Sequence, residues 1–258
     1  MPTIIFKATE ACNSNCIYCD VVHKKKPRTI PLDLFKIAFE RFNEYLLENP
    51  REEICVIWHG GEPCMAGLNL YKTALRHLED ICPQTRGRIR FAIQSNITMI
   101  TQEFIDVFKE MGIYTIGTSY EPIPGIRGIG KKRDSKLYNK KFFDGVNLLE
   151  KNGMTWGFIY VVTKNVLDKP LEIFYHLTNL KLTGGFDFHP VLVYEDAAQE
   201  SQSTAITQEE FADFLGTIFK EWWEHRERYQ HIDPFDSYFK YYTSDYNCLG
   251  CGDAPTCG

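Results

Sequence analysis

The 258-residue sequence lacks any run of about 18 apolar residues, so it predicts no membrane-spanning helix. It also lacks an excess of basic residues, because 29 Lys and Arg stand against 34 Asp and Glu and leave a net charge of −5. This balance argues against sequence-independent binding of nucleic acid. The segment from Met1 to Glu10 lacks the basic and apolar regions of a signal peptide, and we therefore expect a cytoplasmic protein.

Internal repeats and low-complexity tracts are also absent. No Ser/His/Asp arrangement and no pair of carboxylates stands out as a catalytic motif. The composition, with 44% hydrophobic and 24% charged residues, is typical of a soluble globular protein. The chain is long enough to bury a substantial core in one large domain.

Short β-rich runs alternate with segments of helical periodicity along most of the chain. Strands are predicted at 4–8, 54–59, 89–94, 113–118, 155–162 and 185–193, and helices at 31–47, 70–81, 101–111, 138–151, 167–179 and 207–229. Repeated βα units imply parallel strands with right-handed crossovers. Six units rather than eight predict an α/β fold with a partial (β/α)6 barrel, similar to an incomplete TIM barrel.

The expected barrel occupies residues 1–230, and a short cysteine-bearing extension occupies residues 231–258. The polar segment 195–204 is the best candidate for a linker. Four unusual stretches follow the first four predicted strands, at 12–19, 60–63, 95–96 and 118–121. Because the loops after parallel strands lie at one end of a barrel, these four stretches predict one shared site.

Nine cysteines are present, an odd number in a chain without signs of secretion, so a disulfide framework is not expected. Three of them are scattered and are predicted to be small buried side chains, namely Cys55, Cys64 and Cys82. The other six form two clusters, Cys12, Cys16 and Cys19 near the start and Cys248, Cys251 and Cys257 near the end. Clustered thiols in a reducing compartment more often bind metal or take part in chemistry.

The spacing Cys12-x3-Cys16-x2-Cys19 brings three thiolates close enough to bind one metal centre. A four-iron cluster normally takes four cysteines, so three would leave one iron open to a substrate or cofactor. A structural zinc site is the alternative, completed by His23 or by a distant cysteine.

These residues resemble a known family. The segment CNSNCIYC at 12–19 resembles the CxxxCxxC signature of the radical S-adenosylmethionine (SAM) enzymes, including the aromatic Tyr18 before the third cysteine. HGGEP at 59–63 resembles their GGEP motif, and QSNIT at 94–98 resembles their third-strand segment. GTSYEP at 117–122 is a weaker match to a fourth-strand segment that commonly has the sequence SxDGP.

The resemblance implies that Cys12, Cys16 and Cys19 ligate three irons of a [4Fe–4S] cluster and that SAM occupies the fourth. It also implies a set of residues that contact SAM: Tyr18, Gly60, Gly61, Glu62, Pro63, Gln94, Ser95, Asn96, Ser119 and Arg127. Glycines allow close approach of the backbone, and Glu62 can accept hydrogen bonds from the SAM ammonium group. Arg127 is the favoured partner of the SAM carboxylate.

The pattern Cys248-x2-Cys251-x5-Cys257 predicts a second metal site. It resembles the first three cysteines of a CxxCx5CxxxC motif in the SPASM subgroup, whose C-terminal extension holds auxiliary [4Fe–4S] clusters. The fourth position falls beyond Gly258, so either the chain is part of a longer protein or the site takes an outside ligand. Zinc binding and a tail without metal are the alternatives.

By resemblance, one electron from a donor such as flavodoxin or ferredoxin would allow SAM to be cleaved to a 5′-deoxyadenosyl radical that abstracts hydrogen from a substrate. A peptide or protein is the expected substrate, with oxidation or a carbon–carbon or thioether crosslink as the outcome. The alternatives are a dehydrogenase or epimerase of a small molecule and a non-catalytic zinc-binding module. Asp187, His189 and Glu195 are candidates for proton transfer by position.

Overall fold

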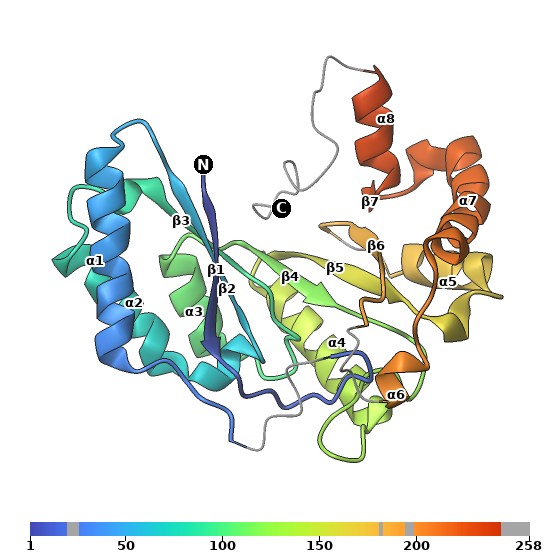
Figure 1. The fold of residues 1–258 in the computed structure, drawn as a ribbon, viewed down its shortest axis with the longest axis horizontal. Coiled ribbons are helices and arrows are strands. Elements are labelled where there is room, and N and C mark those ends of the chain that lie inside the picture. Colours follow the sequence, from blue (N-terminus) through green and yellow to red (C-terminus); the bar gives the residue numbers. More distant parts are fainter. Residues whose placement is uncertain (20–25, 181–182, 194–198, 244–258) are drawn as a thin grey trace.

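The computed structural model describes residues 1–19, 26–180, 183–193 and 199–243, and it shows parallel strands alternating with helices (Figure 1). The strands are β1 (Thr3–Thr9), β2 (Ile54–Gly60), β3 (Ile89–Ile93), β4 (Thr115–Ser119), β5 (Thr155–Val162), β6 (Phe186–Pro190) and β7 (Ile232–Asp233). The helices are α1 (Leu32–Glu48), α2 (Leu68–Asp80), α3 (Gln102–Glu110), α4 (Ser135–Lys151), α5 (Pro170–Thr178), α6 (Gln199–Gln202), α7 (Gln208–His225) and α8 (Phe235–Thr243).

All the strand pairs are parallel, and the strands follow one another in chain order, β1-β2-β3 and then β4-β5-β6-β7. A single parallel bridge between Gln94 and Gly117 joins the two groups. Within the described residues no ladder pairs β1 with β7, so the barrel is open between them. The predicted partial α/β barrel is therefore confirmed.

The core lies between the strands and the surrounding helices. Helix α1 shows why these sequences form such elements, since Phe35, Phe39, Phe42 and Leu46 recur at helical spacing and all four are buried. Burying each such side chain stabilises the fold by about 1.5–3 kcal/mol. Trp58 on β2 is fully buried among these aromatic rings. This packing fixes the strand ends, which carry the site.

Part of the predicted linker is instead structured. Residues 199–202 form the short helix α6, and Ser201 and Thr204 are buried. The Ser201 hydroxyl donates a hydrogen bond to the Ile17 carbonyl at 2.5 Å. The expectation of a linker is therefore wrong for 199–204, because small polar side chains there satisfy backbone groups of the loop after β1. In Figure 1 that loop, in dark blue, runs along the lower edge of the protein toward α6.

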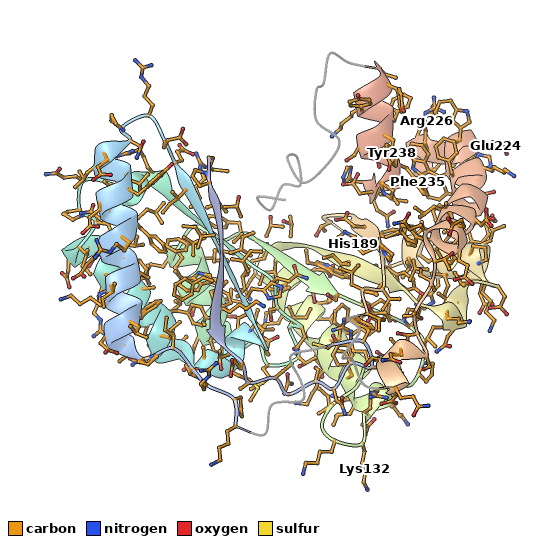
Figure 2. The ribbon with its side chains drawn as sticks, viewed as in Figure 1. Lys132, His189, Glu224, Arg226, Phe235 and Tyr238 are labelled. Atoms are coloured by element: carbon orange, nitrogen blue, oxygen red, sulfur yellow. The ribbon has the colours of Figure 1, made fainter. Side chains whose placement is uncertain are left out.

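A seventh strand continues the sheet beyond the expected boundary at residue 230. Strand β7 pairs with β6 through Phe186–Ile232 and Asp187–Asp233, and Ile232 is fully buried. Helix α8 follows, and Figure 2 shows Phe235 and Tyr238 on it, beside α7. A strand of two residues is too short to produce a periodic pattern, which explains why it was not predicted. The boundary itself stays a prediction.

The scattered cysteines are all buried. Cys64 and Cys82 are free thiols, as predicted, whereas Cys55 is disulfide-bonded, contrary to the expectation of a simple apolar thiol. His23, Glu195 and the three terminal cysteines Cys248, Cys251 and Cys257 lie outside the described residues. None of the described helices is both long and apolar enough to cross a membrane.

Candidate active site

The loop that carries the first three cysteines, residues 12–19, is held by a second segment, residues 126–130, which follows β4. Three backbone hydrogen bonds connect the two segments: Asn15 N–H to the Gly128 carbonyl at 2.8 Å, Ile17 N–H to the Ile126 carbonyl at 2.8 Å and Gly130 N–H to the Asn13 carbonyl at 3.0 Å. Ser14 and Ile129 form an antiparallel bridge in the same ladder. We call residues 12–19 the cysteine loop and residues 126–130 its supporting segment.

The thiols of the cysteine loop are largely shielded from solvent. Cys16 is 6% exposed, and Cys12 and Cys19 are partly buried. Burial raises the pKa of Cys12 to about 11 and that of Cys16 to about 12. A bound metal reverses this preference, since coordination deprotonates a thiol. The Ser14 N–H donates to Cys12 Sγ at 3.4 Å, a contact that stabilises the thiolate form.

The donor set of the cysteine loop is three thiols from one short segment. In an iron–sulfur cluster each thiolate ligates a separate iron, so three thiols from one loop are a set that such a cluster can take. His23 and the terminal cysteines, which would complete a zinc site instead, lie outside the described residues. The cysteine loop therefore fits a cluster held by three thiolates, and zinc stays the alternative.

Glu62 joins the ends of β2 and β3. Its carboxylate is 1% exposed and accepts three hydrogen bonds, from Cys64 N–H at 2.9 Å, Ser95 Oγ at 2.8 Å and Asn96 N–H at 2.7 Å. Burial raises the pKa of Glu62, and these donors act in the opposite direction. Glu62 and Ser95 are thus occupied within the protein, and their contact with SAM stays a prediction.

Gly60 and Gly61 are required by the chain itself. Gly60 has a φ of +135°, and a Cβ on Gly61 would lie 2.1 Å from the Ala11 carbonyl oxygen. The Glu62 N–H donates to that same carbonyl at 2.7 Å. The two glycines therefore allow the backbone after β2 to approach the backbone just before the cysteine loop, in addition to any ligand. Pro63 is buried and begins the 3-10 turn Pro63–Ala66.

Asn96 connects the end of β3 to the cysteine loop. Its Nδ2 donates to Asn13 Oδ1 at 2.9 Å, to Ser14 Oγ at 3.1 Å and to Cys12 Sγ at 3.9 Å. Two residues earlier, Gln94 Nε2 donates to the Thr118 carbonyl at 2.7 Å and contacts Ser119 Oγ at 3.4 Å. The predicted residues of the third and fourth strands are thus brought together beside the cysteines.

Arg127 is paired inside the protein rather than left open for a ligand. It is 7% exposed, and its Nε donates to Glu121 Oε2 at 2.6 Å. Its Nη2 donates to the Tyr18 hydroxyl at 2.5 Å, and Tyr18 in turn donates to Glu121 Oε1 at 2.6 Å. Arg127 thus already has a carboxylate partner in Glu121, and its contact with the SAM carboxylate stays a prediction. Lys132, in contrast, extends away from the protein (Figure 2).

The barrel encloses a cavity of about 320 Å³. Apolar residues of β1, β2 and β3 line one side, and the rest of the lining includes Gly117 of β4, Gly157 of β5 and the Gly184–Gly185 pair just before β6. Its polar lining comprises His59, Gln94, Thr115, Thr118, Asp187, His189, His231 and Asp233. His189 is labelled on β6 in Figure 2. Gln94, which lines the cavity, follows β3 directly, and Asn96, two residues further along, contacts the cysteine loop.

The cavity contains a cluster of histidines and carboxylates. His231 Nε2 lies 3.2 Å from Asp233 Oδ2, and this contact raises the pKa of His231. His189 Nε2 lies 3.9 Å from Asp187 Oδ2. Burial, assisted by the charge of Asp233, raises the pKa of Asp187 to about 6. Asp187 and His189 were expected from their position, whereas His231 and Asp233 were missed because β7 carries no periodic signal.

These features define a class of protein: a partial parallel α/β barrel whose first loop after a strand carries three thiols and is joined to the loop after β3 through Asn96. A family model, the radical SAM superfamily, matches residues 6–177. The chain belongs to the radical SAM superfamily.

Several relatives are serine-type anaerobic sulfatase-maturating enzymes. The one from Bacteroides thetaiotaomicron is 28% identical over 232 residues, which cover 82% of this chain and 54% of that protein. The one from Klebsiella aerogenes is 26% identical over 216 residues, covering 82% of this chain and 51% of the relative. The chain thus spans about half the length of these curated relatives.

Solved structures share the fold. Histidine-tagged anSMEcpe with bound AdoMet superimposes with a TM-score of 0.77 at 20% identity, covering 94% of this chain and 66% of that chain. Native anSMEcpe with bound AdoMet and the Kp18Cys peptide gives the same TM-score at 18% identity, with the same coverage.

Proposed function

We propose that this protein cleaves SAM reductively and uses the resulting 5′-deoxyadenosyl radical to abstract hydrogen from a peptide or protein substrate. The proposal depends mainly on one observation, the connection between the cysteine loop and the barrel cavity. Asn96 contacts Cys12 Sγ, while Gln94, two residues before it, lines the cavity. A SAM molecule bound next to the cysteine loop would therefore lie near a substrate group in the cavity.

The residues of the chain would divide the work of binding. Cys12, Cys16 and Cys19 would hold a [4Fe–4S] cluster, which when bound supplies the electron for SAM cleavage. Gln94 lines the cavity and contacts Ser119 Oγ at 3.4 Å, and both side chains are suited to hydrogen-bond the ribose or carboxylate of SAM. Glu62, Ser95 and Asn96 would keep the loops in register, and their contact with SAM stays a prediction.

A peptide or protein substrate is supported by the relatives and by the size of the cavity. Relatives named as sulfatase-maturating enzymes act on proteins, and one solved neighbour carries a bound peptide. A cavity of about 320 Å³ is at the lower end of ligand pockets and suits one amino-acid side chain. Asp187, with a pKa of about 6, is the proposed proton acceptor, with His189 beside it.

Further parts of the proposal rest on the sequence pattern. Cys248, Cys251 and Cys257 are proposed as ligands of an auxiliary [4Fe–4S] cluster. A one-electron donor such as flavodoxin or ferredoxin is the proposed redox partner.

The same cavity volume would also accommodate a small molecule, which keeps a dehydrogenase or epimerase of a small substrate as a second candidate. Formation of 5′-deoxyadenosine by the anaerobically reconstituted protein separates the two. Stimulation by a synthetic peptide with a central Cys or Ser supports the first candidate. Stimulation by sugars or aminocyclitols, with none by peptides, supports the second.

The cluster assignment is tested by Cys16→Ala, with Cys82→Ala as the matched control, since Cys82 is a buried free thiol far from the loop in sequence. We expect Cys16→Ala to lose the iron–sulfur absorbance, because one thiolate ligand is missing. The rate of 5′-deoxyadenosine formation should fall by about 100-fold or more, since disturbing the surroundings of a metal ligand already costs up to about 100-fold. Cys82→Ala should retain both. Normal SAM cleavage by Cys16→Ala would refute the proposed function.

A further inference from the structure

The register of the ladder places Arg127 directly opposite Cys16. The hydrogen bonds Asn15–Gly128 and Ile17–Ile126 flank this pair on both sides. In an antiparallel ladder, the position between two hydrogen-bonded pairs is a non-hydrogen-bonded pair, in which the Cα atoms are about 4.5 Å apart and the side chains approach closely. The cationic residue Arg127 is thus the cross-strand neighbour of Cys16, a proposed cluster ligand.

The Arg127 side chain is fixed by a buried network. Glu121 accepts from Arg127 Nε at 2.6 Å, and the Tyr18 hydroxyl accepts from Nη2 at 2.5 Å. Tyr138 lies under the guanidinium group, whose central carbon is 5.4 Å from the ring centroid. Both members of the Arg127–Glu121 pair are nearly inaccessible, with exposed fractions of 8% and 2%. Solvent therefore screens this pair weakly, and its field acts on the cysteine loop.

The two charges of the pair are not equivalent with respect to the loop. Arg127 belongs to the supporting segment and faces Cys16, whereas Glu121 lies outside the ladder and is anchored toward β5 through the Val161 N–H at 3.4 Å. The positive end of the pair is thus the nearer one to the cysteines. Tyr18 links both charges to the loop, since its hydroxyl contacts each of them.

We propose that Arg127 is a positioning residue that favours the reduced state of the cluster bound at Cys16, with Glu121 partly offsetting its charge and Tyr18 linking it to the cysteine loop. The inference rests on the proposed function, because it requires the cluster. Reduction adds one negative charge at the cysteines, and a fixed positive charge nearby stabilises that state. Groups around a metal site commonly tune its potential in this way.

Opposite charge changes provide the decisive experiment. The full chain is reconstituted anaerobically with iron and sulfide, and the cluster potential is measured by redox titration followed by electron paramagnetic resonance. Arg127→Gln should shift the potential to more negative values, since the nearer positive charge is lost. Glu121→Gln should shift it to more positive values, since Arg127 is left without its counter-charge. A purely structural role would move both variants in the same direction.

Three further variants keep the test decisive if Arg127→Gln fails to load iron. Arg127→Lys retains the charge and should return the potential toward that of the wild type. Tyr18→Phe removes the hydroxyl that links the pair to the loop but no charge, and should shift the potential less than either Arg127→Gln or Glu121→Gln. Arg133→Gln removes a second cation, whose Nε donates to the Asn15 carbonyl at 2.8 Å and whose charge also acts on Cys16. Because Arg133 is paired with the exposed Glu200, this variant should shift the potential to more negative values by less than Arg127→Gln does.

The outcomes separate this inference from the proposed function. The inference on Arg127 would be overturned if the potential shifted in the same direction in Glu121→Gln and Arg127→Gln, or in neither of them. The proposed function would still stand in that case, provided that the wild type binds the cluster and cleaves SAM. A wild type that binds no four-iron cluster would overturn both.

Discussion

Asp187 carries a stability cost at neutral pH that can be measured without any cofactor. Its carboxylate lines the cavity and lies 3.9 Å from Nε2 of His189, whose own pKa is lowered by burial. Burial, and then the charge of Asp233, raise its pKa from 3.8 to about 6, while His231 acts in the opposite direction. Replacing the carboxylate by the isosteric amide in Asp187→Asn should remove that cost.

The sign and size of the stability change in Asp187→Asn follow from the linkage between proton binding and folding. Because the folded-state pKa is raised, the folded protein binds more protons than the unfolded chain between pH 3.8 and about 6, and stability falls as pH rises through this range. A shift of about two pKa units corresponds to roughly 3 kcal/mol. The side chain is one-third exposed, so after solvent screening we expect about 1–2 kcal/mol.

Urea unfolding of the apo protein at several pH values measures this effect. Asp187→Asn should match the wild type near pH 4 and exceed its free energy of unfolding by about 1–2 kcal/mol above pH 6.5. Asp213→Asn, which changes an exposed aspartate on α7, is the control and should show no such pH-dependent gain. A stability difference for Asp187→Asn that stays constant with pH would refute the reasoning.

Two other substitutions test the framework around the cysteine loop. The Glu62 carboxylate accepts from two backbone N–H groups and from the Ser95 hydroxyl, and in Glu62→Gln an amide N–H₂ would face one of these donors. We expect this variant to lower the free energy of unfolding by about 1–3 kcal/mol in urea titrations. An unchanged unfolding midpoint would contradict the role of Glu62 in joining the loops after β2 and β3. Gly61→Ala places a Cβ 2.1 Å from the Ala11 carbonyl oxygen, so we expect lower stability together with reduced iron loading. Gly87→Ala, where a Cβ meets no atom within 4 Å, is its control, and equal iron loading in the two variants would argue against the close approach.

Much of the architecture was predictable because its signals are local. Alternation of apolar residues predicted six of the seven strands, and helical spacing predicted α1 from Phe35, Phe39 and Phe42. The cysteine loop was equally visible, since its three thiols lie within eight residues of one another. Each of these features depends on residues that are close in sequence. Such residues are also close in space in any globular fold.

The network around the cysteine loop was not predictable in the same way. Arg127 was expected to bind a ligand carboxylate, yet it pairs with Glu121. The Ser201 hydroxyl bonds to the Ile17 carbonyl across 184 residues of sequence, in a segment expected to be a linker. A polar residue in a loop has the same local pattern whether its partner is a ligand, water or another loop. The identity of the partner depends on how the loops meet at the end of the barrel.

Reading the chain alone therefore establishes the family motif, the order of the elements and the three thiols that define the chemistry. Folding in three dimensions adds the cavity and its His–Asp cluster, which joins Asp187 to Asp233 through the β6–β7 pairing. It also sets Arg127 opposite Cys16. These relations arise from strand register and from contacts between distant segments, and they form only when the whole barrel packs, because no local pattern encodes which strands or loops become neighbours.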